Sequence, residues 1–168
     1  REMKFKFNIF NILIVTSFLL IPLNVLSSDK ILHRGNGAEP DTLDPHLATG
    51  HWEGSIINDI FIGLFTKGED GSSIKGSVNN YHKSDNGLVY TFNLRKDHFW
   101  SDGIKVTAKD YVNGLRRVLN PVTASQYGSL LYLIKNAYEV NSGKLKPESL
   151  GVREISEFTL EIILNYPA

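Results

Sequence analysis

The segment Leu88–Leu119, with the sequence LVYTFNLRKDHFWSDGIKVTAKDYVNGLRRVL, decides the fold of this chain. Its first part, Val89–Leu94, alternates and is rich in β-branched and aromatic residues, which predicts a half-buried strand. Ser101–Gly103 combines serine, aspartate and glycine and predicts a turn. The segment is therefore expected to begin with a strand and to reverse direction after it.

A helix is expected after this turn. Thr107 is a favourable N-cap, and Asp110 follows three residues later, which makes a start like a capping box. The helix is expected to run to Leu119 and to end before Pro121, because proline cannot continue a helix. The segment thus predicts a strand, a turn and a capped helix.

The rest of the chain is expected to add short strands and two more helical segments. Asp85–Gly87, with the sequence DNG, is a strong hairpin signal that leads into Val89–Leu94. Apolar spacing predicts a helix at Glu53–Phe61 and a less regular one at Gln126–Asn141. Further strands are expected at Lys30–Arg34, Leu64–Thr66, Ile74–Val78, Tyr81–Lys83, Val152–Ser156 and Thr159–Leu164.

These elements define an α+β fold class, with a mainly antiparallel sheet and helices packed on it. The large aromatic residues beside the predicted strand, Phe92, Phe99 and Trp100, are expected in the core, since such residues usually bury against a neighbouring helix.

The N-terminus has the pattern of a secretory signal peptide. Lys4 and Lys6 precede an apolar run at residues 9–26, and small or short residues follow at the positions that a signal peptidase reads. Cleavage is expected near Ser27 or Ser28, and the mature chain is expected to be exported.

An uncleaved membrane anchor is the alternative, because the apolar run approaches the length that spans a bilayer. Pro22 and Asn24 near the end of the run favour cleavage. Arg1 and Glu2 stand before Met3, the expected initiator, and are interpreted as an over-extended reading frame.

Composition excludes several classes of function. The chain has no cysteine, so disulfides, thiol catalysis and cysteine metal sites are excluded. Without residues 1–28 it carries 15 basic and 17 acidic residues, and no basic stripe or block remains. Nucleic acid is therefore not an expected partner. A cleaved, cysteine-free export product fits a soluble protein of the periplasm.

The pattern of reactive residues does not favour an enzyme. The histidines at positions 33, 46, 51, 82 and 98 lie on separate elements, and none repeats at metal-ligand spacing. Asp41 and Asp44 are a weak candidate for a carboxylate pair or a calcium loop, because Pro45 follows without further ligands. Ser101 and Ser129 lack the strand-to-helix elbow of a hydrolase nucleophile. No catalytic residue, metal site or cofactor is predicted.

Several pieces of the chain, in order, carry a family resemblance. These are Leu43–His46, Gly63–Leu64, Tyr90–Asp110, Asn120–Pro121 with Thr123–Ser125, and Leu160–Pro167. Together they resemble the extracytoplasmic solute-binding proteins of the oligopeptide and dipeptide family, which serve ABC importers. The match covers about residues 32–167, nearly all of the mature chain.

The resemblance implies part of one lobe of a type II periplasmic-binding-protein fold. Residues 29–61 would be the first segment of a discontinuous domain, residues 62–168 a small inserted α+β domain, and the second lobe would be absent. The whole protein would be a periplasmic monomer. It would bind an extended peptide between two lobes and deliver it to a membrane permease, with no cofactor.

The resemblance also implies four ligand contacts. Thr49, Gly50 and His51 match a segment whose backbone pairs with the peptide main chain, as in strand addition. Gly50 would let another backbone approach closely. The family's oligopeptide members often carry an acidic residue where Thr49 stands. Tyr127 matches a tyrosine that lines the cleft, and its flat ring with one polar tip suits that role.

Other interpretations stay open at this point. Thr49–His51 also fits an ordinary loop before a helix, and Tyr127 fits packing at a helix start. The chain could be a truncated, non-functional remnant, or a small secreted interaction domain without ligand binding. The residues do not specify whether a ligand would be an oligopeptide, a dipeptide or another small solute.

Overall fold

The computed structural model describes residues 31–168 of the 168-residue chain. The expected signal peptide, residues 1–28, lies outside the described residues. Asn36–Ala168 form one compact unit, and the residues before Asn36 belong to a separate one. Residues 31–34 adopt no regular secondary structure, so the strand expected at Lys30–Arg34 is wrong over these four residues. An isolated strand has no ladder partner to satisfy its backbone.

The compact unit contains three α-helices, three 3-10 turns and six strands among its described residues. In chain order they are α2 (His51–Ile60), β1 (Phe65–Lys67), β2 (Ser73–Lys75), β3 (Val78–Lys83), β4 (Val89–Leu94), α3 (Ala108–Leu119), η1 (Pro121–Thr123), η2 (Gly128–Leu131), α4 (Ala137–Asn141), η3 (Pro147–Ser149), β5 (Val152–Ser156) and β6 (Thr159–Ile163). This is the α+β organisation that the sequence predicts.

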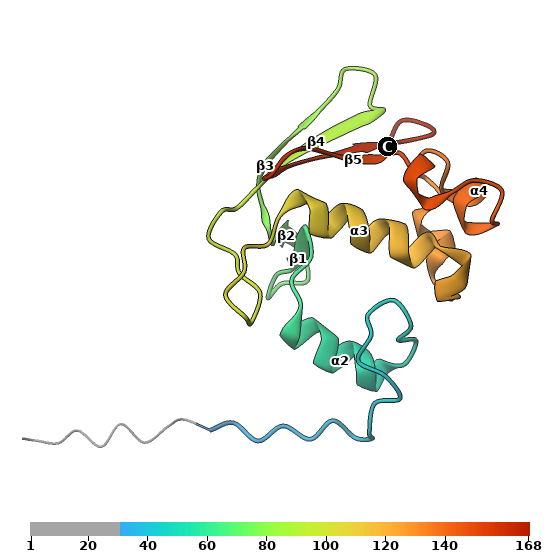
Figure 1. Cartoon of the computed structure of the whole chain (residues 1–168). Helices are drawn as coiled ribbons and strands as arrows, with labels where there is room; N and C mark the ends of the chain where they lie inside the picture. The colour runs from blue at the N-terminus through green and yellow to red at the C-terminus, as the bar shows by residue number, and fades with distance from the viewer. Residues whose placement is uncertain (1–30) are drawn as a thin grey trace, which may run out of the picture. The chain divides into compact units, whose positions relative to one another are not determined.

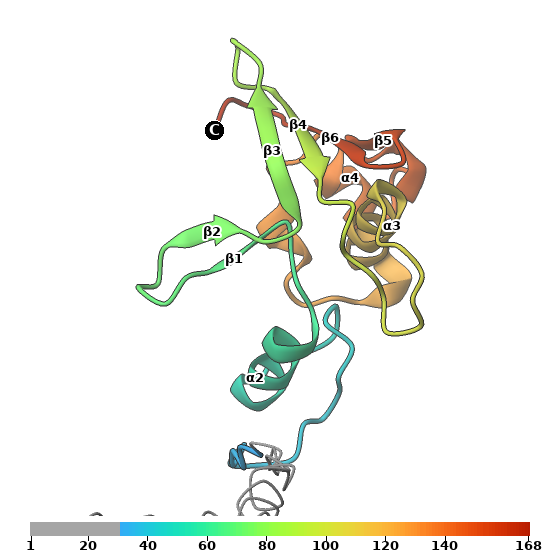
Figure 2. The ribbon, with the colours of Figure 1, turned by 90° about the vertical axis from the view of Figure 1, so that its left-hand side faces the viewer.

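Four strands form an antiparallel sheet in the order β3-β4-β6-β5, and β1 and β2 form a separate antiparallel ribbon (Figures 1 and 2). The predicted hairpin joins β3 to β4. Its Gly87 has a φ of +68°, a left-handed conformation that glycine adopts without steric cost. The expected strand at Val89–Leu94 has the observed bounds of β4, at the centre of the sheet beside β6.

One face of this sheet is apolar and the other is polar. On the apolar face Phe92 pairs with Leu160, and both are buried. On the other face Asn93 donates to Asn80 at 2.7 Å between Nδ2 and Oδ1. Helix α3 covers the apolar face, and Figure 1 shows it running beneath the strands. This alternation places the core between α3 and the sheet.

The start of α3 is the predicted capping box. The Asp110 carboxylate accepts a hydrogen bond from the Thr107 backbone N–H at 2.7 Å and another from the Thr107 hydroxyl at 2.9 Å. The backbone N–H of Ala108 donates to the carbonyl of Glu157 at 2.8 Å, in the turn between β5 and β6. The helix start is therefore held both locally and by the sheet.

The helix expected at Gln126–Asn141 is wrong as a single helix. The chain forms η2 and the short α4 there, and Ile134 between them makes an isolated bridge to Leu164. Lys135 donates its N–H to the carbonyl of Ile163 at 2.9 Å, and Asn136 has a φ of +64°. Pairing with the end of β6 therefore replaces the helical hydrogen bonds at this point.

Of the three aromatic residues expected in the core, only Phe92 lies there. Phe92 is 7% exposed, whereas Phe99 is 55% exposed and Trp100 is 42% exposed, so the prediction is wrong for the last two. They lie in the loop between β4 and α3, where the Trp100 N–H donates to the Ile104 carbonyl at 2.8 Å. The local turn directs this loop away from the sheet.

The capping box gives a direct test of the fold. Asp110→Ala removes both hydrogen bonds to Thr107 and should lower the free energy of unfolding by about 1 kcal/mol. Urea denaturation followed by circular dichroism measures this change. Lys109→Ala, at the exposed neighbouring position of the same helix turn, is the matched control and should leave the midpoint almost unchanged. Equal midpoints for the two variants would contradict a capping role.

Candidate ligand-contact site

The structure brings two of the predicted contact positions together across 78 residues of chain. The hydroxyl of Tyr127 donates to the backbone carbonyl of Thr49 at 3.2 Å. Gly50 is the N-cap residue of α2, and His51 is its first helical residue. All four residues are exposed, and Tyr127 keeps 51% of its surface accessible. The loop before α2 and the segment after α3 thus meet at exposed residues.

Short turns after α3 set the position of Tyr127. Asn120 ends α3 and caps η1, because its side-chain oxygen accepts from the Val122 N–H at 3.1 Å. Asn141 of α4 donates to the Leu119 carbonyl at 3.2 Å and accepts from the Tyr132 hydroxyl at 2.8 Å. These bonds keep the segment that carries Tyr127 against the end of α3.

The carboxylate of Glu53 lies directly beside Gly50. A Cβ atom on Gly50 would lie 2.1 Å from Oε2 of Glu53. Glu53 is 4% exposed, and its Oε1 accepts from the Asp41 N–H at 3.0 Å. The close neighbour of Gly50 is therefore a side chain of the first turn of α2. The approach of a ligand backbone to Gly50 stays a prediction.

Glu53 is a site residue that the sequence interpretation missed. It stands in the first turn of α2, where a carboxylate is favoured by the unpaired backbone N–H groups. Hydrogen bonds from the N–H of Asp41, then from its own N–H, lower its pKa below the ordinary value of 4.5, and burial opposes the shift. The sequence did contain a signal for this role, because Glu53 follows the N-cap residue Gly50 by three positions.

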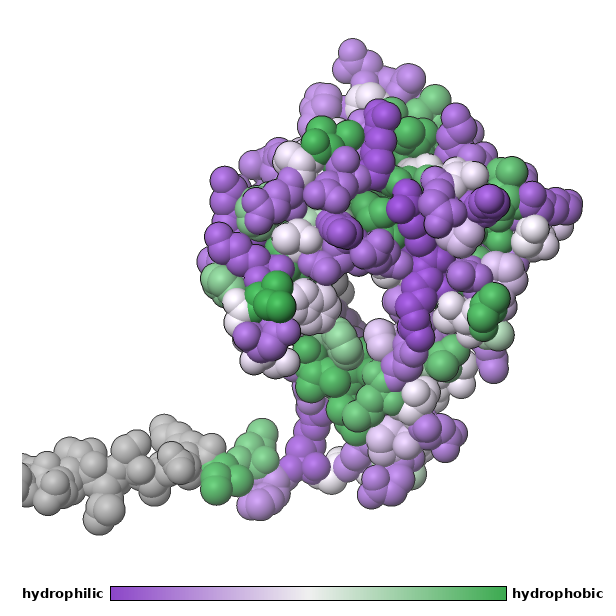
Figure 3. Space-filling model, viewed as in Figure 1, coloured by the Kyte–Doolittle hydropathy of each residue, from purple (hydrophilic) through white to green (hydrophobic). Residues whose placement is uncertain are grey.

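An apolar cavity of about 400 Å³ lies between α2, α3 and the loop that carries Trp100. Ile60, Phe61 and Ile62 line it from one side, and Trp100 lines it with Phe99 from another. In Figure 3 hydrophobic residues gather over the part of the molecule that holds α2. The exposed side chains of Phe99 and Trp100 are therefore part of one apolar surface, which they share with the residues at the end of α2.

Within residues 31–168 no group of three or more histidine, cysteine, aspartate or glutamate residues could hold a metal ion. The same part of the chain contains no helix that is both long and apolar enough to cross a membrane.

Comparison with known proteins decides the family. A model described as "Bacterial extracellular solute-binding proteins, family 5 Middle" matches residues 42–168. The chain belongs to this family. Its members are solute-binding proteins, and the family resemblance seen in the sequence is confirmed.

Two relatives from Escherichia coli K12 show the extent of the match. The periplasmic oligopeptide-binding protein OppA is 40% identical over 150 residues, which cover 88% of this chain and 27% of that protein. The periplasmic murein peptide-binding protein MppA is 37% identical over 145 residues, which cover 85% of this chain and 27% of that protein. The chain thus spans about a quarter of the length of these relatives.

Solved structures agree with the fold. OppA of Listeria monocytogenes bound to peptide superposes with a TM-score of 0.76 at 36% identity, covering 78% of this chain and 26% of that one. OppA of Haemophilus influenzae in complex with RPPGFSPFR gives 0.75 at 33% identity, covering 80% and 26%. The chain therefore has the α+β fold of a portion of a periplasmic binding protein.

The Glu53 carboxylate predicts a specific pH dependence. Its pKa is lower in the folded than in the unfolded chain, so its stabilising contribution is present above the ordinary value of 4.5. That contribution is lost as the pH falls through the folded value. Glu53→Gln should reduce the loss of stability on acidification, measured by thermal unfolding between pH 7 and pH 3.

Glu69→Gln is the control for this prediction, because Glu69 is exposed in the turn between β1 and β2. It should retain the pH dependence of the unchanged chain. If Glu53→Gln retained it as well, the Glu53 carboxylate would not be held by the backbone groups that surround it.

Proposed function

We propose that this chain is the N-terminal part of a periplasmic substrate-binding component of an ABC importer that binds extended peptides. The observation that carries the proposal is the family match over residues 42–168, with relatives named as oligopeptide-binding proteins. The exposed surface formed by Thr49 and Tyr127 supports it, because it offers backbone and an aromatic ring together.

The proposed contact is a main-chain one. An extended peptide would pair its backbone with Thr49, Gly50 and His51, which gives affinity that does not depend on the peptide's side chains. The Thr49 carbonyl already accepts one bond from Tyr127, and a carbonyl oxygen has a second lone pair for a peptide N–H. The Tyr127 ring would lie along the ligand as a flat apolar wall.

The proposed mechanism needs a second lobe. Peptide contacts on both lobes would favour a closed state through a hinge motion, and the closed protein would dock on a membrane permease. Separate ATPase subunits would drive transport. In this scheme residues 29–61 and 62–168 are the first domain segment and the inserted domain of one lobe, and the protein acts as a monomer.

Location and chemistry follow from the same proposal. Relatives in Escherichia coli are named as periplasmic, which supports export of this chain with cleavage of residues 1–28. Because the family binds solutes, we propose no catalytic activity, no cofactor and no metal.

A second candidate is a truncated remnant or a small secreted interaction domain without ligand binding. The apolar cavity favours this candidate, because its walls include exposed side chains such as Phe61 and Trp100. Exposed apolar surface of this kind marks interaction sites in proteins. The two candidates differ in whether peptide binding depends on Tyr127.

The peptide-binding proposal makes a prediction for the isolated chain. Residues 29–168 supply one wall of the proposed cleft, so calorimetry with trialanine should give a dissociation constant far weaker than about 1 µM. A sub-micromolar value would show that no second lobe is needed and would contradict the two-lobe scheme.

A chimera tests the contacts themselves. The matched segment of Escherichia coli OppA can be replaced by residues 42–168, because the two proteins are 40% identical over 150 residues. In this chimera Tyr127→Ala should weaken trialanine binding about tenfold, which corresponds to ~1.4 kcal/mol. Tyr138→Ala, which alters a tyrosine of similar exposure on α4, is the matched control. Equal affinity for both variants would favour the second candidate.

A further inference from the structure

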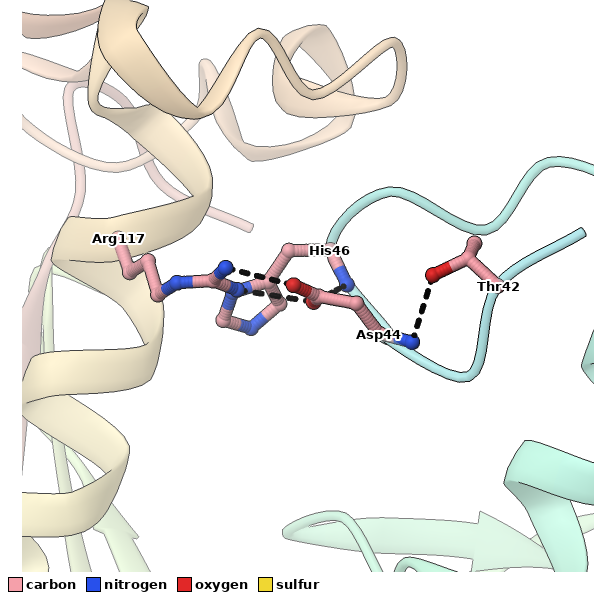
Figure 4. Close-up of polar contacts among 4 residues, drawn as sticks. All are labelled: Thr42, Asp44, His46 and Arg117. Carbon is pink, nitrogen blue, oxygen red and sulfur yellow. Dashed lines mark hydrogen bonds and ion pairs between the residues drawn. The ribbon is translucent and has the colours of Figure 1, made fainter.

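An ion-pair cluster joins the last turn of α3 to the loop that precedes α2 (Figure 4). The Arg117 guanidinium donates to both carboxylate oxygens of Asp44, at 2.8 Å from Nη1 to Oδ1 and 2.6 Å from Nη2 to Oδ2. Nη1 also lies 2.8 Å from Nδ1 of His46. Arg117, Asp44 and His46 form the Arg117 cluster, which connects segments 73 residues apart.

The carboxylate of Asp44 also organises its own loop. It accepts from the His46 N–H at 3.0 Å, and the Asp44 N–H donates to the Thr42 hydroxyl at 3.1 Å. The Asp44 carbonyl accepts from the N–H groups of Leu47 at 3.1 Å and Ala48 at 3.0 Å. The turn is thus closed immediately before Thr49, and the Arg117 side chain attaches it to α3.

The cluster requires a neutral His46. Arginine is only a donor, so Nδ1 of His46 is the acceptor and its proton is on Nε2. Burial and the Arg117 charge lower the pKa of His46 below 6.5, and Asp44 opposes them. The hydrogen bond from Arg117 and that from the His46 N–H lower the pKa of Asp44 to about 2. Asp110 and Tyr111 line the cavity beside His46.

The loop therefore has two attachments to one continuous segment. Arg117 holds it at Asp44 and His46, and Tyr127, ten residues after Arg117, holds it at the Thr49 carbonyl. The planar Arg117 guanidinium makes two parallel hydrogen bonds to the Asp44 carboxylate. This bidentate geometry fixes the orientation of the carboxylate as well as its distance from Arg117. A lysine at position 117 would keep the positive charge but would lose this bidentate hydrogen-bonding geometry.

We propose that Arg117 is a positioning residue, which holds the backbone of Thr49–His51 in register with Tyr127 through its fork on Asp44 and His46. This inference rests on the proposed function for its effect on ligand, since Arg117 itself lies outside the four contact positions. Its effect on loop geometry does not depend on any ligand.

The test combines a conservative variant with a matched control. Arg117→Lys keeps the charge and removes the fork. Arg95→Lys makes the same change in the Arg95–Asp97 pair, which has bonds of 3.0 and 2.8 Å and lies in the loop after β4. In the OppA chimera Arg117→Lys should weaken trialanine binding about fivefold or more, and Arg95→Lys should leave it unchanged.

Three further measurements separate positioning from general stability. In the 168-residue chain, NMR contacts between the Tyr127 ring and Thr49 should be lost in Arg117→Lys and kept in Arg95→Lys, with both variants folded by circular dichroism. The pKa of the Asp44 carboxyl should rise from about 2 toward 3.8 in Arg117→Ala. Added N-ethylguanidinium should restore the NMR contacts in Arg117→Ala.

The outcomes distinguish this inference from the proposed function. If Tyr127→Ala weakens binding but Arg117→Lys does not, the peptide site stands and the positioning role is wrong. If neither variant changes binding, the proposed function fails. The NMR contacts between the Tyr127 ring and Thr49 then show whether Arg117 positions the loop. Their loss in Arg117→Lys alone supports the positioning role, and unchanged contacts overturn it.

Discussion

The packing of α3 against one face of the four-stranded sheet is the interaction on which the rest of the structure depends. Ala108, Val112 and Leu119 recur along one side of α3 and are buried, as are Phe92 and Leu160 on the facing strands. Each fully buried large side chain contributes about 1.5–3 kcal/mol relative to exposure. Without this layer neither the helix nor the half-polar sheet would be stable, because each has an apolar face that needs a partner.

This packing also determines where the side chains of the candidate site lie. Because α3 is held along its length, its last turn presents Arg117 at a fixed place, and the short turns after it present Tyr127. The loop before α2 has no strand or helix of its own between Pro45 and Gly50, and these two side chains attach it to α3 and to the segment after α3. A rigid helix thus orders an exposed loop, which is how many binding surfaces are built.

The local elements could be predicted from the sequence because their signals are local. β4 has the bounds that the alternation at Val89–Leu94 predicts, and the capping box at Thr107 is visible as a spacing of three. The single helix at Gln126–Asn141 was wrong because Ile134 pairs with a strand end 30 residues later, and a propensity pattern contains no such information. The Arg117–Asp44 pair was missed for the same reason.

The structure has two kinds of exposed residue: hydrogen-bonded residues at the candidate site, and large apolar residues beside the cavity. Tyr127 and Thr49 are exposed but hydrogen-bonded to each other, so one polar contact holds both of them in place at the surface. Phe61 and Trp100 are exposed beside an apolar cavity, where leaving large side chains in water opposes folding. Relatives about three times as long have further polypeptide beyond the matched segment. Pro45 and His46 of the loop before α2 also line this cavity, so the apolar surface adjoins the segment that carries Thr49.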